Sequence, residues 1–269
     1  MFQGDAAQCS RYHRPTMTDQ LSLRFEPALP RLPTDLRPML AQSAAEPFDS
    51  AKHLFEPSWG GERALAFIET ADGAPFRLMD EDGKDLAALL PELADLPSRV
   101  MARSAVIDGE LVVVDAAGRA DPDGLAARLK GEAGPAVSYL VFDLLVLDGK
   151  QLIGQPLARR RQSLKQTLTP GDMVVAVPAI VGEGLALHAA VRAQGIAATV
   201  ARVLSAPYLP GVRSRLWLRI EATPVEPPAG MDKDPAHADQ ATLGLESPVT
   251  DPTGSPVLAV IRRLPLEWD

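Results

Sequence analysis

Apolar residues at strand spacing recur through the middle of the chain. Two such runs flank the turn "ADG" and predict a β-hairpin over residues 63–80. Residues 104–119 contain two strand segments, and residues 137–152 contain a buried strand that ends in a D-G turn. The pattern returns to strand over residues 196–208 and over the short segment 215–221. The predicted strands therefore follow one another in consecutive groups.

Apolar residues at helical spacing predict three helices. The first covers residues 85–97 and stops at a proline, and the second covers residues 156–168 and exposes a basic face. The third covers residues 184–195 and is closed by Gly195. These helices lie between groups of strands with no regular strand–helix alternation, which favours a mixed, largely antiparallel α+β domain.

Composition divides the chain into three parts. Residues 1–34 are polar and proline-rich and predict an N-terminal arm. Residues 35–222 carry the globular pattern, and residues 223–269 predict a proline-rich linker and a short tail with one strand-sized apolar run. Met17 is an alternative start, so the sequence leaves open whether residues 1–16 belong to the native protein.

The overall balance of residues excludes several functional classes. The 269 residues carry a net charge of −8, which argues against tight, charge-driven binding to DNA. No apolar run is long enough to span a membrane, and no secretory leader is visible, so the cytoplasm is the expected compartment. A single cysteine and scattered histidines exclude a disulfide framework and predict no metal site.

The segment "FEPSWGGER", residues 55–63, has the composition of a binding site. It combines an acid, an aromatic side chain, a glycine pair for close backbone approach, and an arginine. Its only candidate nucleophile is Ser58, which has no histidine placed to activate it. The segment is therefore a working active site, the remains of one, or a turn.

Five segments, in order, resemble the adenylation domain of ATP-dependent DNA ligases, most closely the bacterial end-joining type. They are "LRPMLA", "FEPSWGGER", "VIDGELVVVD", "YLVFDLLVLDGKQLIGQPLARRR" and "GIAATVARVLSAPYLPGVRSRLWLRIE". The resemblance implies the ligase nucleotidyltransferase (ATP-grasp-like) fold, with two mostly antiparallel sheets packed with helices. The residues after Ala222 are too few for a β-barrel of ordinary size, so no complete OB-fold domain is expected.

The resemblance implies a role for several side chains. In such a site a lysine attacks the α-phosphate of ATP and holds AMP as a phosphoramidate, while cations neutralise the phosphates. Carried over by position, Glu56 contacts the adenine amine, Glu110 binds the ribose, and Phe142 stacks on the purine. Arg63 lies beside the sugar or the nick phosphate, and Arg219 replaces a phosphate-binding lysine.

The nucleophile position departs from the family pattern. Where the family has its lysine, this chain has Ser58, and the aspartate two residues later is Gly60. Lys52 lies about 20 Å away along an extended strand and cannot substitute. Losing the nucleophile of a covalent mechanism typically costs a factor of about 10⁴–10⁶ in rate. The motif therefore resembles a ligase active site without its reactive group.

Other departures concern the phosphates and DNA. Ala197 replaces the acid expected near the start of the fifth segment, and Ala198 replaces the glycine after it. Glu221 reverses the charge of a closing lysine, and Glu81 stands where the family usually has a DNA-binding arginine. Arg202 fills a lysine position with its charge retained.

Each of these residues also has a purely structural interpretation. Phe142 is compatible with an ordinary core aromatic, and Glu110 is compatible with a buried ion pair in which Arg63 is the partner. The basic segments are compatible with a solvated helix face and a turn, or with a patch that contacts DNA. The candidate DNA contacts are Arg159, Arg160, Arg161, Lys165, Arg213 and Arg215.

Three functions are compatible with the sequence. The preferred hypothesis is a catalytically inactive adenylation domain that acts as a binding or scaffold protein in DNA repair or end joining. It would bind DNA weakly, have a DNA-repair protein as partner, and have ATP or adenosine as its candidate ligand. The first alternative is an active ligase that uses ATP and Mg²⁺, and the second is an interaction module that binds neither nucleotide nor DNA.

Overall fold

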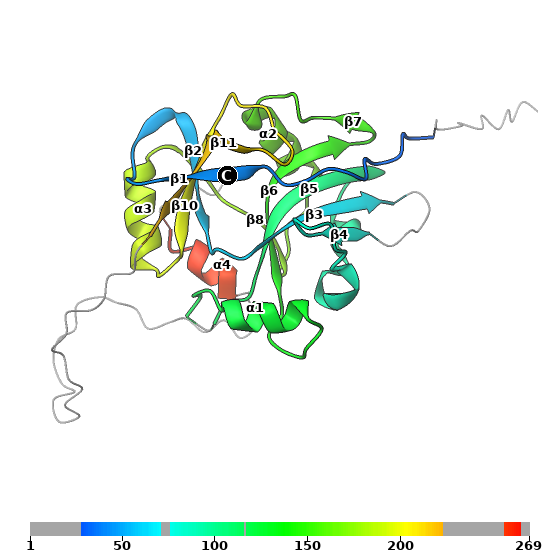
Figure 1. Ribbon diagram of the computed structural model, residues 1–269, viewed down its shortest axis with the longest axis horizontal. Helices are drawn as coiled ribbons and strands as arrows, with labels where there is room; N and C mark the ends of the chain where they lie inside the picture. Colours follow the sequence, from blue (N-terminus) through cyan, green and yellow to red (C-terminus); the bar gives the residue numbers. More distant parts are fainter. Residues whose placement is uncertain (1–27, 71–75, 116, 223–255, 265–269) are drawn as a thin grey trace, which may run out of the picture.

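The computed structural model describes residues 28–70, 76–115, 117–222 and 256–264, and it consists of two β-sheets with helices packed around them (Figure 1). The first sheet has five strands in the order β1 (Leu40–Ala44), β11 (Arg213–Glu221), β10 (Ala198–Val203), β2 (Ser50–Ser58) and β9 (Ile180–Gly182). β1 is parallel to β11, whereas the other neighbours are antiparallel. The first sheet therefore joins strands from both ends of the domain.

The second sheet is built from the middle of the domain. Its strands lie in the order β4 (Arg77–Met79), β3 (Glu62–Glu69), β5 (Ser104–Val112), β6 (Ser138–Leu147) and β7 (Lys150–Gln151). β8 (Val174–Ala176) adds to β6 as a parallel neighbour, and all other pairs are antiparallel. Only residues 59–61 separate β2 from β3, so the chain passes from one sheet to the other within a short connection.

The described helices are short. The α-helices are α1 (Pro122–Leu129), α2 (Leu157–Thr167), α3 (Gly184–Ala193) and α4 (Pro256–Ile261), and the 3₁₀ helices are η1 (Ala87–Leu89), η2 (Pro91–Leu93) and η3 (Leu96–Arg99). Asp121 caps α1 by accepting the backbone N–H of Gly124, and Pro122 follows at the first helical position. α3 is followed by Gly195, whose φ of +68° permits the left-handed turn that ends a helix.

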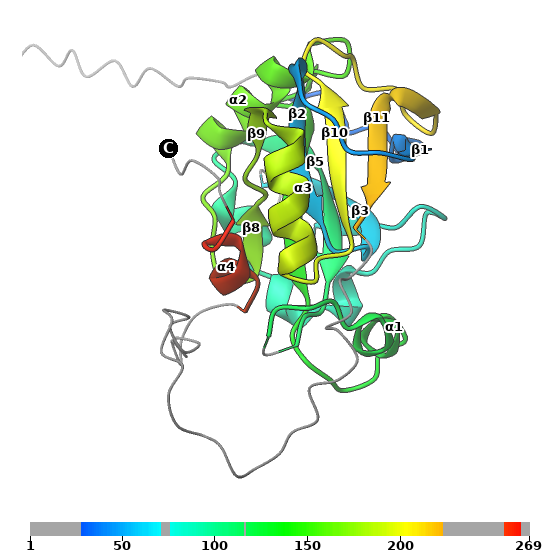
Figure 2. The same ribbon diagram turned by 90° about the vertical axis from the view of Figure 1, so that its left-hand side faces the viewer.

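Two apolar clusters hold the layers together. The first cluster contains side chains from both sheets, from α3 and from α4, so the C-terminal helix belongs to the core. The second cluster covers the other side of the second sheet with residues of η1–η3, α1 and α2. Figure 2 shows α3 lying across β2 and β10, and α4 on the side of β8, away from β1 and β11.

These elements confirm the predicted α+β class with two mostly antiparallel sheets. The hairpin over residues 63–80 is present as β3 and β4, although its turn lies outside the described residues. The helices predicted over residues 156–168 and 184–195 are α2 and α3, and the buried strand over residues 137–152 is β6, which ends at the predicted D-G turn.

Several local predictions were wrong. Residues 85–97 form three 3₁₀ helices, because Pro91 and Pro97 each lack the N–H that a continuous α-helix needs. Of residues 104–119, Ser104–Val112 form one strand, β5, and the described residues from there to Ala120 form no second strand but only an isolated bridge between Val114 and Ala120. The apolar run of the tail forms the helix α4, not a strand. α1 lies in a segment for which no helix was predicted.

Most of the N-terminal arm and of the proline-rich linker, residues 1–27 and 223–255, lies outside the described residues. No helix in the described ranges is long and apolar enough to cross a membrane.

Candidate functional site

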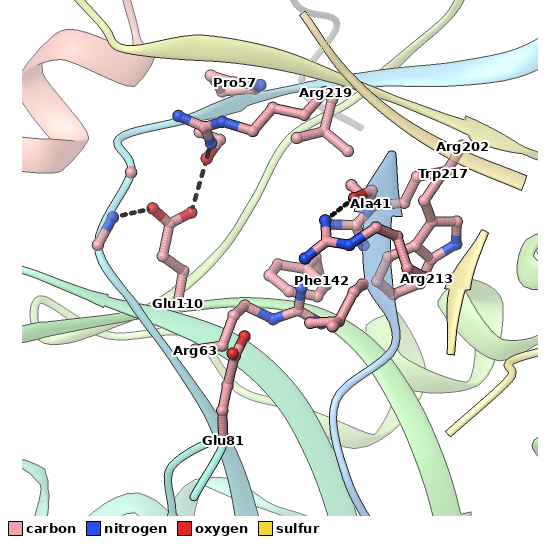
Figure 3. A pocket seen from close by; sticks show the side chains of 15 residues that line it. Ala41, Pro57, Arg63, Glu81, Glu110, Phe142, Arg202, Arg213, Trp217 and Arg219 are labelled. Carbon is pink, nitrogen blue, oxygen red and sulfur yellow. Dashed lines mark hydrogen bonds between the residues drawn. The ribbon is translucent and has the colours of Figure 1, made fainter. Parts of the chain in front are cut away.

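A cavity of about 210 Å³ lies where the connection between β2 and β3 passes between the two sheets (Figure 3). Both sheets and the connection contribute side chains to its wall. The structure brings together six of the residues predicted at the nucleotide site as wall residues: Ser58, Arg63, Glu110, Phe142, Arg202 and Arg219. Arg213, a predicted DNA contact, also lines the cavity. Glu56 lies behind this wall and contacts it through Arg202.

Ser58 is held by two charged neighbours. Its Oγ donates a hydrogen bond to Glu110 Oε2 over 3.1 Å and accepts one from Arg219 Nη1 over 2.9 Å. The residue is only 6 % exposed. The serine hydroxyl therefore bridges a carboxylate of the second sheet and a guanidinium of the first sheet.

The carboxylate of Glu110 accepts hydrogen bonds from Ser58 and from the connection between β2 and β3, and among the described residues it forms no ion pair with an arginine. Its second oxygen, Oε1, accepts the backbone N–H of Gly61. A Cβ at Gly61 would lie 2.0 Å from the carbonyl oxygen of Leu111, so only glycine permits this close approach. The predicted structural alternative, an ion pair between Glu110 and Arg63, is wrong.

Arg63 binds Asp108, a residue that the sequence-based search missed. Arg63 Nη2 lies 2.6 Å from Asp108 Oδ2 and its Nε lies 3.2 Å from Oδ1. Burial acts to lower the pKa of Arg63, but the charge and hydrogen bond of Asp108, together with the nearby Tyr208 and Glu110, outweigh burial and raise the pKa, so Arg63 stays charged. The Tyr208 hydroxyl donates to Asp108 over 2.7 Å and accepts the N–H of Met39 over 2.8 Å. Asp108 thereby ties the second sheet to the segments that flank β1 and β10.

Strand alternation contained a signal for Asp108. Residues two apart on a strand share a face, so the face that holds Glu110 also holds Asp108. Tyr208 follows the end of β10 and carried no comparable signal, because its hydrogen-bond partner lies 100 positions away.

The guanidinium of Arg202 lies against two aromatic rings. Its Cζ is 3.8 Å from the ring centroid of Phe142 and 4.2 Å from that of Trp217, and the two rings meet nearly edge to face at 85°. Its Nε is 3.1 Å from Glu56 Oε2, and Glu56 also pairs with Arg161. Burial lowers the pKa of Arg202, although the charge of Glu56 opposes this. Arg202 thus contacts both groups that were expected to bind a purine.

Arg219 forms an ion pair with Glu221, a residue of the same strand, β11. Its Nε lies 2.7 Å from Glu221 Oε1. Glu221, the residue at the expected position of a closing lysine, therefore pairs with Arg219 and lowers its net attraction for a phosphate.

The predicted DNA contacts divide into two groups. Arg159, Lys165, Arg213 and Arg215 are exposed. Arg160 is 0 % exposed and makes two 2.8 Å hydrogen bonds to Asp143, which is also fully buried. Arg161 pairs with Glu56 and donates to two backbone carbonyl groups. Arg160 is therefore unavailable to DNA, and Arg161 is largely committed to the interior, because both turn toward the second sheet.

No group of three or more histidine, cysteine, aspartate or glutamate side chains in the described part of the chain could hold a metal ion.

Comparison with known proteins gives a consistent result. A family model described as "ATP dependent DNA ligase domain" matches residues 38–221. The chain is 30 % identical over 186 residues to the multifunctional non-homologous end joining DNA repair protein LigD of Mycobacterium tuberculosis strain H37Rv, covering 69 % of this chain and 24 % of LigD. It is 33 % identical over 207 residues to DNA ligase C1 of Mycolicibacterium smegmatis, covering 68 % of this chain and 56 % of that protein. The chain thus spans about a quarter of LigD and little more than half of DNA ligase C1.

Two solved structures resemble the fold. Mycobacterial DNA ligase D complexed with ATP and MES gives a TM-score of 0.60 at 27 % identity, covering 70 % of this chain and 60 % of that one. The ligase domain of M. tuberculosis LigD gives a TM-score of 0.58 at 28 % identity, covering 69 % of this chain and 59 % of that one.

Proposed function

This chain belongs to the family of ATP-dependent DNA ligase domains, and we propose that residues 35–222 form an adenylation domain that no longer attaches AMP to itself. We further propose that it acts as a binding or scaffold protein in DNA repair by end joining. The names of its relatives support this setting, because LigD is a non-homologous end joining DNA repair protein. A DNA end, a repair protein, or both would then be its partners.

The observation that carries the proposal is the state of Ser58. Its hydroxyl stands at the position of the family's lysine and has no amine to offer an α-phosphate. Among the described residues that line the cavity, none is a lysine or a histidine. Glu110 accepts the hydroxyl's hydrogen bond, but a carboxylate is too weak a base to generate a serine alkoxide at neutral pH.

The surroundings of Ser58 stabilise the unreacted hydroxyl. Ser58 Oγ accepts a hydrogen bond from Arg219 and donates its own proton to Glu110. Arg219 in turn pairs with Glu221. The hydrogen bond from Arg219 lowers the electron density on the serine oxygen, so it disfavours nucleophilic attack by this oxygen.

Intact-mass spectrometry tests this proposal. The protein is incubated with ATP and Mg²⁺, and separately with ATP and Mn²⁺, alongside DNA ligase C1 of M. smegmatis as the positive control. We expect the mass of this protein to stay unchanged, because Ser58 offers no phosphoramidate linkage. A stable gain of one AMP would refute the proposal and favour the alternative of an active ligase.

A further inference from the structure

The corner between Phe142 and Trp217 is already filled by the chain itself. The Arg202 guanidinium lies 3.8 Å from the ring centroid of Phe142, which is close contact for a planar group on an aromatic ring. Arg202 is 3 % exposed, and Figure 3 shows it on the same side of the cavity as Trp217. The guanidinium of Arg63 lies farther out, 4.8 Å from the Phe142 ring centroid.

This corner has the chemistry of a site for a flat group that donates hydrogen bonds. An aromatic face supplies stacking, and the buried carboxylate of Glu56 accepts N–H groups at the edge. A purine with an exocyclic amine meets both requirements, and so does a guanidinium. Because Arg202 already stacks on Phe142 and pairs with Glu56, a purine and the Arg202 side chain would need the same space.

From this geometry we propose that Arg202 excludes purines from the cavity. This inference rests on the proposed function and extends it from the loss of AMP attachment to the loss of purine binding. The remaining cavity of about 210 Å³ is smaller than the roughly 300–1,000 Å³ of ordinary small-molecule sites, so it cannot take a whole nucleotide while Arg202 is in place. The specificity of the cavity is therefore set by an arginine at a position where the family has a lysine.

The neighbours of Arg202 make its removal tolerable. Glu56 keeps its second partner, Arg161, when Arg202 is shortened, so no buried carboxylate is left without a cation. Neither Nε nor Nη1 of Arg202 makes a hydrogen bond within the described part of the chain, so truncation removes the ion pair with Glu56 but breaks no hydrogen bond at these two atoms. Shortening this side chain should open the Phe142 face without unfolding the domain.

The test is adenosine binding to the wild-type protein and to Arg202→Ala, measured by isothermal titration calorimetry. Adenosine has no phosphate, so its binding is independent of whether the protein can be adenylated. We expect no measurable binding to the wild type and a gain of at least about tenfold in Arg202→Ala. A role as a phosphate contact predicts the opposite for ATP, namely weaker binding when the cation is removed.

Two further variants separate the open ring from the freed carboxylate. Arg202→Lys keeps a cation for Glu56 but has no planar group to cover Phe142, so it should also gain adenosine binding. Arg161→Ala frees one side of Glu56 and leaves Arg202 stacked, so it should gain none. Thermal unfolding confirms that each variant is folded. Wild-type binding of adenosine that weakens in Arg202→Ala, or folded Arg202 variants that gain nothing, would overturn the proposal.

Discussion

Replacing Arg160 by methionine is expected to remove a large part of the stability of this domain. Arg160 lies on α2 between the exposed Arg159 and Lys165, yet neither its side chain nor that of Asp143 has any exposed surface. The guanidinium holds both oxygens of Asp143 and also donates to the backbone carbonyl groups of Gln155 and Ala206. Methionine fills similar volume but offers none of these four hydrogen bonds.

The size of the effect follows from what remains buried. Removing one partner of a buried ion pair typically costs about 3–5 kcal/mol, because the other charge is left without compensation. Asp143 would keep only the N–H of Leu144. The free energy of unfolding of a whole domain is about 5–15 kcal/mol, so this single substitution removes a large fraction of the stability of a typical domain. At about 2–4 °C per kcal/mol for a domain of this size, Tm should fall by roughly 6–20 °C.

Urea unfolding followed by circular dichroism measures this loss. Arg159→Met is the matched control, because Arg159 is the adjacent exposed arginine on the same helix and should change stability by less than about 0.5 kcal/mol. The double variant Arg160→Met with Asp143→Leu removes both charges and should recover most of the loss. Equal effects of Arg160→Met and Arg159→Met would show that Arg160 is not buried with Asp143.

Two further predictions concern pH and DNA. The pKa of Glu62 is raised by burial and by the carboxylates of residues 80–82, so ionisation of Glu62 destabilises the fold. The stability that the protonated Glu62 carboxyl contributes is fully present below the ordinary pKa of 4.5 and is lost as pH rises through the folded pKa. Glu62→Gln should therefore be more stable than the wild type at pH 7 but not at pH 4, and urea midpoints that differ equally at both pH values would contradict this. DNA binding by fluorescence anisotropy should be micromolar or weaker near physiological salt and fall steeply as salt rises. Glu81→Arg adds a cation to the cavity wall that also contains the exposed Arg213, so this variant should bind DNA more strongly. Glu132→Arg, an exposed control beyond α1, should leave DNA binding unchanged. Nanomolar binding by the wild type, or equal gains in both variants, would contradict this interpretation of the surface.

The convergence of the site residues was predictable because it depends on motif order and strand periodicity. Ser58 is the last residue of β2, and the short connection 59–61 leads from it to β3. The register between β3 and β5 pairs Arg63 with Glu110, which places Glu110 near this connection. The resemblance supplied the expectation that both would meet Phe142 and Arg219, and all four line the cavity. What the resemblance could not supply was the conformation of residues that differ from the family, above all Arg202.

Arg160 shows the opposite case. An arginine on an amphipathic helix normally extends into solvent, so helical spacing gave no reason to bury it. Its partner Asp143 stands in the apolar strand β6, where a lone acid signals that some cation must reach it. The sequence thus contained the need for a partner but not its identity, which depends on how α2 packs on the sheet.

Local errors have equally physical causes. Residues 85–97 carry helical spacing, but two prolines divide them into separate turns. The tail run is too short for periodicity to separate strand from helix, and tertiary packing decides in favour of α4, where Val257, Val260 and Ile261 are all buried in the core.

The parallel pairing of β1 with β11 has a consequence for how this chain is made. The second sheet uses only residues 62–176, so all its strands have been synthesised before β10 and β11 exist. β1 and β2 are made earlier still, but the strands that flank β2 begin at residue 180, and β1 pairs only with residues 213–220. On a ribosome that releases the chain from its N-terminus, the first strands to emerge are therefore among the last to find their partners. Phe55 and Met39 are fully buried in the finished domain. Until more than half of the domain has been synthesised, the strands that flank β1 and β2 do not exist, so these two apolar side chains lack those neighbours.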